Sequence, residues 1–254
     1  MSDELDLVVE ALSGAKRLVV LTGAGMSKDS GMPTFREAQT GLWAKYDPQQ
    51  LATPAAFKTN PARVFGWYVW RYHKALSLVP HAGYGALVRL ESAFDDVLVV
   101  TQNVDGLHTR AGSSHVVELH GSLRAFRCFK QGHPYDEELV GRLSVPASGE
   151  VSPPSCPHCG SPIRPGVVWF SESLPDAAVR RAWAAAEVCD AMLVVGTSGL
   201  VYPAAGLPDS ALLKQSSVIE VNPDPTPLSD RADVWWPARA EVALAQLADR
   251  LAPL

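Results

Sequence analysis

The sequence has few cysteines and no long apolar run, and each of these absences excludes a class of protein. Four cysteines among 254 residues are too few for a framework of disulfide bonds. No window approaches about 18 consecutive apolar residues, and the N-terminal stretch MSDELDLVVEAL lacks the basic and apolar segments of a secretory signal. We therefore expect a cytoplasmic protein with no membrane-spanning segment.

Positive charge is also scarce, since 22 lysines and arginines face 27 acidic residues and the formal net charge is −5. A protein that binds nucleic acid or an anionic membrane normally has a basic face. We therefore expect neither partner, and any acidic ligand must be recognised locally. The length and the 47% hydrophobic content predict a globular protein with one substantial core and a small additional module.

Short apolar runs with the character of buried strands recur along the chain, and helical patterns separate most of them. The strand-like runs cover residues 18–21, 96–101, 116–119, 192–196 and 218–221. The clearest helical patterns cover residues 6–15, 177–189 and 241–251. This alternation predicts an α/β fold, with a Rossmann-type, mainly parallel sheet and helices on both of its faces.

Two segments interrupt this alternation. Residues 34–80 are rich in aromatic side chains without strand-like alternation, which predicts a helical insertion, whereas residues 128–165 carry three cysteines and several prolines, which is typical of a small metal ribbon. We predict two domains. The large, discontinuous domain comprises residues 1–37, 81–125 and 166–254, and the small domain combines residues 38–80 with the zinc-ribbon-like module at 126–165.

The first strand runs directly into the glycine-rich sequence GAGMSKDSGMPTFR. Gly23 and Gly25 stand where a turn between strand and helix needs positive φ and close approach of the backbone to a phosphate. In the dehydrogenase fingerprint a third glycine follows three residues later and opens a helix, but Lys28 occupies that position. The segment therefore predicts a nucleotide site that does not belong to a dehydrogenase, without an ordinary dinucleotide-binding helix after the turn.

Polar groups follow the other strands, at the edge where open α/β sheets bind their ligands. Gln102, Asn103 and Asp105 follow one strand; an ordinary turn of this composition is the alternative. His120 ends the next strand, and an imidazole suits a general base because it titrates near neutral pH. We favour His120 over His108 because His120 ends the more strand-like run. The groups that end two further strands are Gly196, Thr197, Ser198 and Asn222.

A second constellation has the spacing of a metal site. Cys156 and Cys159 form a C-x-x-C knuckle, and Cys128 lies upstream as a partner. A four-cysteine ribbon needs a cysteine where Gln131 stands, so the fourth ligand is either His133 or water, or the site holds no metal. A redox-active pair is a further alternative, but it lacks a thioredoxin-like context. We favour structural zinc.

Taken together, the motifs GAGMSKDSGMPTFR, TQNVDGLH, HGS and GTS, with a cysteine ribbon between the last two, resemble those of the sirtuins, NAD-dependent protein-lysine deacylases. The resemblance spans nearly the whole chain, and the joint occurrence of the motifs is specific. It implies an NAD-binding Rossmann-type domain, a small zinc domain and an acyl-lysine tunnel between them. In such a reaction the acyl oxygen displaces nicotinamide from NAD, and the products are free lysine, nicotinamide and O-acyl-ADP-ribose.

The resemblance also implies roles for individual residues. His120 would be the general base, and Asn103 would act with it at the nicotinamide ribose. The NAD site would comprise Gly23, Ala24, Gly25, Ser27, Phe35, Arg36, Gln102, Asn103, Asp105, Gly196, Thr197, Ser198, Asn222 and Ala240. The substrate peptide would pair as an added strand with Val168, Trp169 and Phe170. Sirtuins usually have glycine where Ser171 follows.

A pair of residues in the helical insertion bears on which acyl group is removed. Tyr68 and Arg71 match the Tyr-x-x-Arg of class III sirtuins, and the Ala-Thr-Pro stretch at residues 52–54 also matches that class. On a helix the two are i, i+3 neighbours, and a phenol with a guanidinium can bind a carboxylate. This implies a preference for succinyl or malonyl groups, with possible deacetylase activity. The alternative is a surface arginine beside a core tyrosine.

Acyl-lysine proteins are thus the expected substrates, and we expect the protein to be a monomer. Two other functions remain open. A protein mono-ADP-ribosyltransferase would also cleave NAD but leave the ribose on protein. A non-catalytic NAD or zinc-ribbon binding module would not need both His120 and Asn103.

Overall fold

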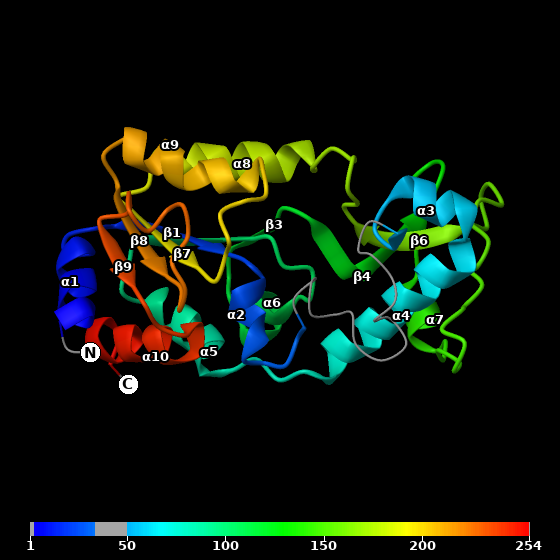
Figure 1. Cartoon of the computed structure of the whole chain (residues 1–254), viewed down its shortest axis with the longest axis horizontal. Coiled ribbons are helices and arrows are strands. Elements are labelled where there is room, and N and C mark those ends of the chain that lie inside the picture. Colours follow the sequence, from blue (N-terminus) through cyan, green and yellow to red (C-terminus); the bar gives the residue numbers. More distant parts are fainter. Residues whose placement is uncertain (1–2, 34–49, 254) are drawn as a thin grey trace.

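The computed structural model describes residues 3–33 and 50–253. Phe35 and Arg36 lie outside the described residues. Two sheets organise the rest: a six-stranded sheet of order β3-β2-β1-β7-β8-β9 and a three-stranded sheet of order β5-β4-β6 (Figure 1). The strands of the large sheet are β1 (Arg17–Thr22), β2 (Asp96–Thr101), β3 (Val116–Glu118), β7 (Ala191–Val195), β8 (Ser217–Val221) and β9 (Val234–Trp236).

All pairs in the large sheet are parallel, and its central strands are buried almost throughout. After their first residue, β1 and β2 are buried at every position, and β7 is buried along its whole length. Layers on both faces of a parallel sheet explain these continuous apolar runs. The α/β fold and its five expected strands are confirmed, whereas the three-residue β9 was too short to be recognised.

Helices cover both faces of this sheet. Val19 and Leu21 of β1 pack in a cluster with α8 (Asp176–Ala186) and α9 (Leu207–Leu213). Leu18 and Val20 point to the opposite face, in the core that also contains side chains of α1, α5 and α10. These three helices span Asp3–Ala11, Ala82–Leu90 and Ala240–Leu251. Alternate side chains of one strand therefore pack in two different cores. The helical patterns near residues 6–15, 177–189 and 241–251 are confirmed.

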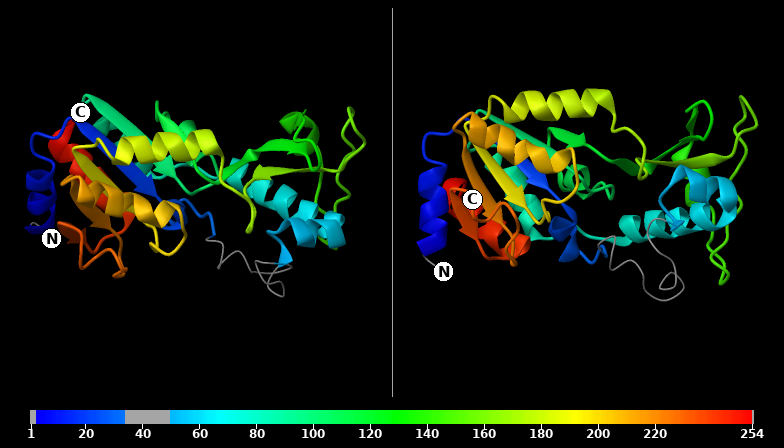
Figure 2. Two further views of the ribbon diagram at one scale, coloured as in Figure 1. Left: turned by 90° about the horizontal axis from the view of Figure 1, so that it is seen from above. Right: turned by 45° about the horizontal axis from the view of Figure 1, so that its top comes forward.

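A second group of elements gathers at the end of the molecule away from both termini (Figures 1 and 2). Its antiparallel sheet contains β4 (Gly121–Cys128), β5 (Pro134–Tyr135) and β6 (Ile163–Val167). Its helices are α3 (Pro54–Thr59), α4 (Pro61–Ser77) and α7 (Glu137–Gly141). The described part of the expected insertion is thus helical. The division into two domains stays a prediction, and β4 runs across its boundary at residue 125.

The two halves of the large sheet meet between β1 and β7. From β1 the chain continues outward to β2 and β3 on one side, and from β7 to β8 and β9 on the other. Such a reversal of strand order opens a crevice at the carboxyl ends of the strands. Short helices α2 (Ala24–Lys28) and α6 (Leu107–Ala111) begin at this edge, along with the turn η3 (Ala204–Gly206).

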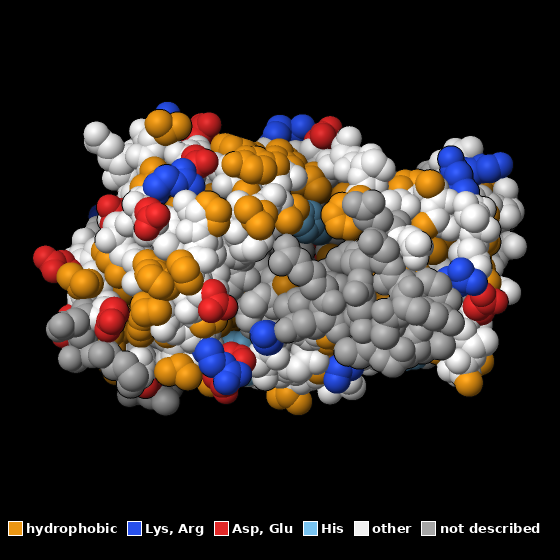
Figure 3. Space-filling model, viewed as in Figure 1, with side chains coloured by type: hydrophobic (Ala, Val, Ile, Leu, Met, Phe, Trp, Pro, Cys, Tyr) orange, Lys and Arg blue, Asp and Glu red, His pale blue; other side chains and the backbone are white. Residues whose placement is uncertain are grey.

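Exposed apolar side chains are found at the surface near this edge as well. Leu200, Val201 and Tyr202 follow β7, and Tyr202 is 72% exposed. Figure 3 shows hydrophobic side chains gathered over the helices α8 and α9. Among the described helices, none is long and apolar enough to cross a membrane.

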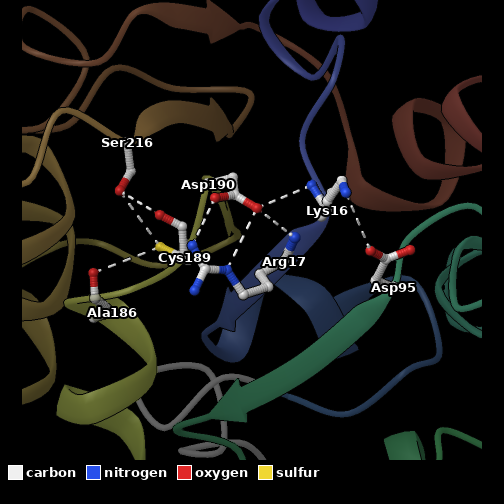
Figure 4. Close-up of polar contacts among 7 residues, drawn as sticks. All are labelled: Lys16, Arg17, Asp95, Ala186, Cys189, Asp190 and Ser216. Carbon is white, nitrogen blue, oxygen red and sulfur yellow. Dashed lines mark hydrogen bonds and ion pairs between the residues drawn. The ribbon is translucent and has the colours of Figure 1, made fainter.

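At the opposite edge of the sheet, Asp190 fastens the start of β1 to the start of β7 (Figure 4). Its carboxylate accepts hydrogen bonds from the backbone N–H groups of Lys16 (3.0 Å) and Arg17 (2.8 Å) and from Arg17 Nη2 (2.9 Å). These bonds hold the pKa of Asp190 well below its usual range. The contact fixes the register of the two central strands far from the ligand edge.

Candidate active site and metal centre

The glycine turn after β1 packs against the turn after β7. A Cβ on Gly23 would lie 2.7 Å from Thr197 Cβ, and a Cβ on Gly25 would lie 2.7 Å from Gly196 Cα. The Gly25 N–H donates to Gly196 O at 2.8 Å. Neither position has room for a side chain, so the two turns meet backbone to backbone.

Two expectations for this turn are wrong. Gly23 has φ of −122°, and Gly25 is not among the described glycines with positive φ, so close approach and not backbone conformation requires glycine here. The turn also opens a helix after all, because α2 begins directly after Gly23. This helix is only five residues long, and its last residue is Lys28, at the position where the dehydrogenase pattern has its third glycine.

The polar residues after β2 form one buried network with Ser27 of α2. Asn103 Nδ2 donates to Gly23 O and to Ser27 Oγ, both at 2.9 Å. Ser27 Oγ donates to Asp105 Oδ2 at 2.7 Å and lies 2.9 Å from the Tyr84 hydroxyl. Burial raises the pKa of Asp105, while its bonds from Leu107 N–H and Ser27 oppose this shift. The structure thus brings Gly23, Ser27, Asn103 and Asp105 together.

His120 lies beside the same network with one ring nitrogen engaged. Its Nδ1 lies 3.0 Å from Gln102 O. Because a carbonyl oxygen only accepts, Nδ1 carries the proton in the neutral ring and Nε2 carries the lone pair. Burial lowers the pKa of His120, and the bond to Gln102 O partly opposes the change. The ring is therefore a neutral base, oriented by the backbone, at neutral pH.

Thr197 joins the two halves of the ligand edge. Gln102 Nε2 donates to Thr197 Oγ1 at 3.0 Å, and Asn222 Nδ2 donates to Thr197 O at 2.9 Å. The ends of β2, β7 and β8 are therefore connected by side chains. Ser198 is exposed, and Ala240 is buried at the first position of α10.

His108, which the sequence left as the second candidate base, lies behind the site. It is 2% exposed, and its Nε2 is 2.9 Å from Thr22 Oγ1. Burial lowers its pKa to about 3, and its ring packs edge-on against Tyr84 with centroids 4.8 Å apart. Sequence reasoning missed Tyr84, because its helical spacing in α5 has the same appearance as that of any core residue.

The segment after β6 has its amide groups already engaged. Val168 N–H donates to His120 O (2.8 Å) and Phe170 N–H to Ala52 O (2.9 Å), while Trp169 N–H donates to Glu172 Oε2 (2.8 Å). A peptide strand beside this segment would therefore have to donate to its carbonyl groups. The next residue, Ser171, has φ of +68°, the left-handed region that favours glycine.

The described residues of the helical insertion place Tyr68 and Arg71 on α4, and both are buried. Arg71 is only 7% exposed, so the alternative of a surface arginine is wrong. Its guanidinium carbon lies 5.0 Å from the centroid of the Trp67 ring, and the Tyr68 hydroxyl accepts a hydrogen bond from Trp169 Nε1 at 3.0 Å. Burial lowers the pKa of Arg71, whereas its interactions with Tyr68 and Asp105 oppose this change. Arg71 therefore lies within electrostatic reach of Asp105, which belongs to the network around Asn103.

Cys128, His133, Cys156 and Cys159 form a cluster with the dimensions of a tetrahedral zinc site. His133 Nδ1 lies 3.6 Å from Cys128 Sγ and 3.5 Å from Cys156 Sγ, and Cys159 Sγ lies 3.7 Å from Cys128 Sγ. A tetrahedron with Zn–S near 2.3 Å and Zn–N near 2.1 Å has edges of about 3.5–3.8 Å. All four potential ligand atoms lie within 4.8 Å of one another, so His133 stands where it could complete the set in place of a cysteine at position 131.

Comparisons with known proteins agree with this architecture. A family model described as the Sir2 family matches residues 23–203. The chain is 53% identical over 218 residues to the "NAD-dependent protein deacylase 1" of Pseudomonas aeruginosa, covering 86% of this chain and 87% of that protein. It is 49% identical over 238 residues to an "NAD-dependent protein deacylase" of Mycobacterium tuberculosis, covering 94% of this chain and 99% of that protein.

Solved structures of Sir2 homologues also match the chain. A crystal structure of a Sir2 homolog–NAD complex has a TM-score of 0.89 and 40% sequence identity, covering 97% of this chain and 93% of that chain. A complex of a Sir2 homologue mutant with ADP-ribose has a TM-score of 0.86 at 40% identity, covering 96% of this chain and 95% of that chain.

Proposed function

The chain belongs to the Sir2 family, and we propose that it is an NAD-dependent protein-lysine deacylase that favours succinyl and malonyl groups over acetyl. The observation that carries the acyl preference is the burial of Arg71 beside Tyr68, within electrostatic reach of Asp105. NAD supplies the anomeric carbon that the acyl oxygen attacks as nicotinamide leaves. The chain's own residues must bind NAD and the acyl-lysine, orient them and accept a ribose hydroxyl proton.

The glycine turn and the polar strand ends suit the two halves of NAD. The lack of side chains at Gly23 and Gly25 lets the turn after β7 pack against the start of α2, and we place the pyrophosphate beside these two turns. Asn103 and Asp105, held by Ser27, offer buried polar groups for the nicotinamide and its ribose. The proposed contacts to the adenosine half are Gly196, Thr197, Ser198, Asn222 and Ala240. Phe35 and Arg36, which lie outside the described residues, are proposed to line the NAD site from the cofactor loop.

His120 is the proposed general base. Its Nδ1–H is held by Gln102 O, so Nε2 presents the lone pair that accepts a ribose hydroxyl proton. The backbone oxygen of His120 accepts from Val168 N–H, which ties the base to the segment proposed to bind the substrate peptide. In this way one residue connects the cofactor side with the peptide side.

The proposed acyl preference follows from the free-energy cost of burying the Arg71 guanidinium. A buried guanidinium loses hydration, and a carboxylate within hydrogen-bond reach compensates for this loss. A planar guanidinium can also hold a carboxylate through two parallel bonds. A succinyl or malonyl terminus supplies this carboxylate and an acetyl group does not, which supports the proposed preference.

The test is the variant Arg71→Met, which keeps a long apolar side chain and removes the charge. We expect kcat/KM for a succinyl-lysine peptide to fall by about 100-fold, as for a lost hydrogen-bonded charge pair, and that for the matched acetyl-lysine peptide to change little. Arg71→Lys serves as the control, since it retains a charge without the planar fork. Equal losses on both peptides in Arg71→Met would contradict the acyl preference.

The proposal also includes zinc as a structural ion, acyl-lysine proteins as substrates, a monomeric state and a cytoplasmic location. None of the four cysteines forms a disulfide, and three of them are in the metal cluster, which is typical of a reducing compartment. The substrate peptide is proposed to lie against Val168, Trp169 and Phe170 and to donate to their carbonyl groups.

A further inference from the structure

A hydrogen bond joins the segment after β6 to the acyl pair on α4. Trp169 Nε1 lies 3.0 Å from the Tyr68 hydroxyl oxygen, across 101 positions of sequence. An indole N–H can donate but not accept, so the Tyr68 oxygen is the acceptor. The proton of the Tyr68 hydroxyl is therefore still available for another partner.

The indole that makes this bond is held firmly. Trp169 is 1% exposed, the Arg164 guanidinium carbon lies 3.4 Å from its ring centroid, and the Phe57 ring centroid lies 5.3 Å away. Arg164 in turn donates through Nη1 and Nη2 to the Glu172 carboxylate, at 2.5 and 2.9 Å. Glu172 also accepts the Trp169 amide N–H. The direction of the indole N–H is thus set by packing and by an ion pair.

A fixed donor on one side of a phenol oxygen directs the phenol's own proton to the other side. In the part of the chain that the structure describes, no acceptor for the Tyr68 hydroxyl proton is recorded. Arg71 follows Tyr68 by three positions on α4, so the two share a face of the helix, and its charge opposes the rise that burial causes in the pKa of Tyr68. A carboxylate between the two would accept from both, and donation from the indole strengthens the phenol as a donor.

We infer that Trp169 is a specificity-determining positioning residue: its indole N–H turns the Tyr68 hydroxyl so that Tyr68 and Arg71 donate together to the carboxylate of an acidic acyl group. This inference rests on the proposed preference for such groups. An acetyl group offers no carboxylate, so the indole N–H adds nothing to its recognition. The effect of Trp169 therefore appears in the ratio of kcat/KM for a succinyl-lysine peptide to kcat/KM for the matched acetyl-lysine peptide.

The experiment measures kcat/KM for succinyl- and acetyl-lysine forms of one peptide with Trp169→Phe, with Tyr68→Phe and with the double variant. We expect Trp169→Phe to lower the succinyl-to-acetyl ratio about tenfold, mainly through KM for the succinyl peptide. In the Tyr68→Phe background, the same change should leave the ratio where it is, because the phenol that the indole orients is absent.

Two further proteins separate hydrogen bonding from packing. Trp169→3-benzothienylalanine keeps the bicyclic shape without the N–H and should reproduce the lower ratio even if Trp169→Phe folds poorly. Phe129→Leu alters a ring whose centroid lies 6.3 Å from that of Trp169, and it should keep the wild-type ratio.

The outcomes distinguish the inference from the proposed function. A wild-type protein without a succinyl preference overturns both. A wild-type preference that survives intact in Trp169→Phe and in the benzothienyl protein overturns only the inference. An equal drop of the ratio with and without the Tyr68 hydroxyl also overturns it, because Trp169 would then act through packing alone.

Discussion

At the scale of single residues, orientation by the backbone distinguishes the two histidines that follow neighbouring strands. His120 donates from Nδ1 to a carbonyl and keeps Nε2 for chemistry, whereas His108 is buried against Thr22 and Tyr84. The sequence favoured His120 because it ends a more strand-like run. The structure adds the physical reason, which is the tautomer that Gln102 O imposes.

The lowered pKa of His120 predicts the acidic limb of the pH profile. A base must be unprotonated to act, and burial lowers the pKa of His120 below the ordinary 6.5. Activity should therefore persist as pH falls past 6.5 and decline only below it. The measurement is kcat/KM for the acyl peptide against pH, between pH 5 and 8. A limb centred above 6.5 would contradict this environment for His120.

Residue identity alone did not reveal the side chains that support the site. Tyr84 reaches Ser27 across 57 positions, and Trp169 reaches Tyr68 across 101. Both aromatic residues have the spacing of core residues, so their polar atoms carry no local signal. Only the fold, which places their elements together, turns these atoms into partners.

At the scale of elements, burial on both faces made the central strands predictable. Continuous apolar runs are required where helices cover both sides of a parallel sheet, and β1, β2 and β7 have them. The glycine turn was harder, because glycine serves two purposes, positive φ and lack of a side chain. Sequence reasoning expected both at Gly23 and Gly25, whereas the structure shows only the lack of a side chain to be required, for the contact with the turn after β7.

The contact between the two turns predicts a steric effect at Gly25. A Cβ there would lie 2.7 Å from Gly196 Cα and 2.8 Å from Gly196 O, which are backbone atoms. Gly25→Ala should therefore lower the free energy of unfolding by about 1–3 kcal/mol and weaken NAD binding. Urea unfolding and NAD titration by calorimetry measure the two effects.

Gly85→Ala is the matched control, because a Cβ on this residue of α5 meets nothing within 4 Å. In a helix interior this change should raise stability by about 0.5–1 kcal/mol and leave NAD binding as it is. If Gly25→Ala behaved like Gly85→Ala, the close approach of the two turns would not matter.

At the scale of the whole molecule, the metal cluster lies at the end of the molecule that is farthest from both chain termini. The cysteine spacing indicated zinc from sequence, but the fourth ligand stayed open because Gln131 stands where a four-cysteine ribbon has its remaining cysteine. The structure favours His133 by bringing its Nδ1 within 3.6 Å of two sulfur atoms.

Metal analysis tests this arrangement. We expect about one zinc per chain in the wild-type protein and in Gln131→Ala, and a large loss of zinc in His133→Ala. Chelation should lower the thermal midpoint of the wild-type protein, since the metal links β4 to the loop at Cys156. Full zinc occupancy in His133→Ala would show that another ligand, such as water, completes the site.

The central claim is that NAD is consumed as a substrate in removing an acyl group from lysine. Mass spectrometry of one reaction with NAD and a succinyl-lysine peptide tests it most directly. We predict equal amounts of nicotinamide, O-succinyl-ADP-ribose and free-lysine peptide, and neither O-succinyl-ADP-ribose nor free-lysine peptide with His120→Ala. ADP-ribose attached to protein with the peptide still acylated, or NAD bound without turnover, would contradict the account.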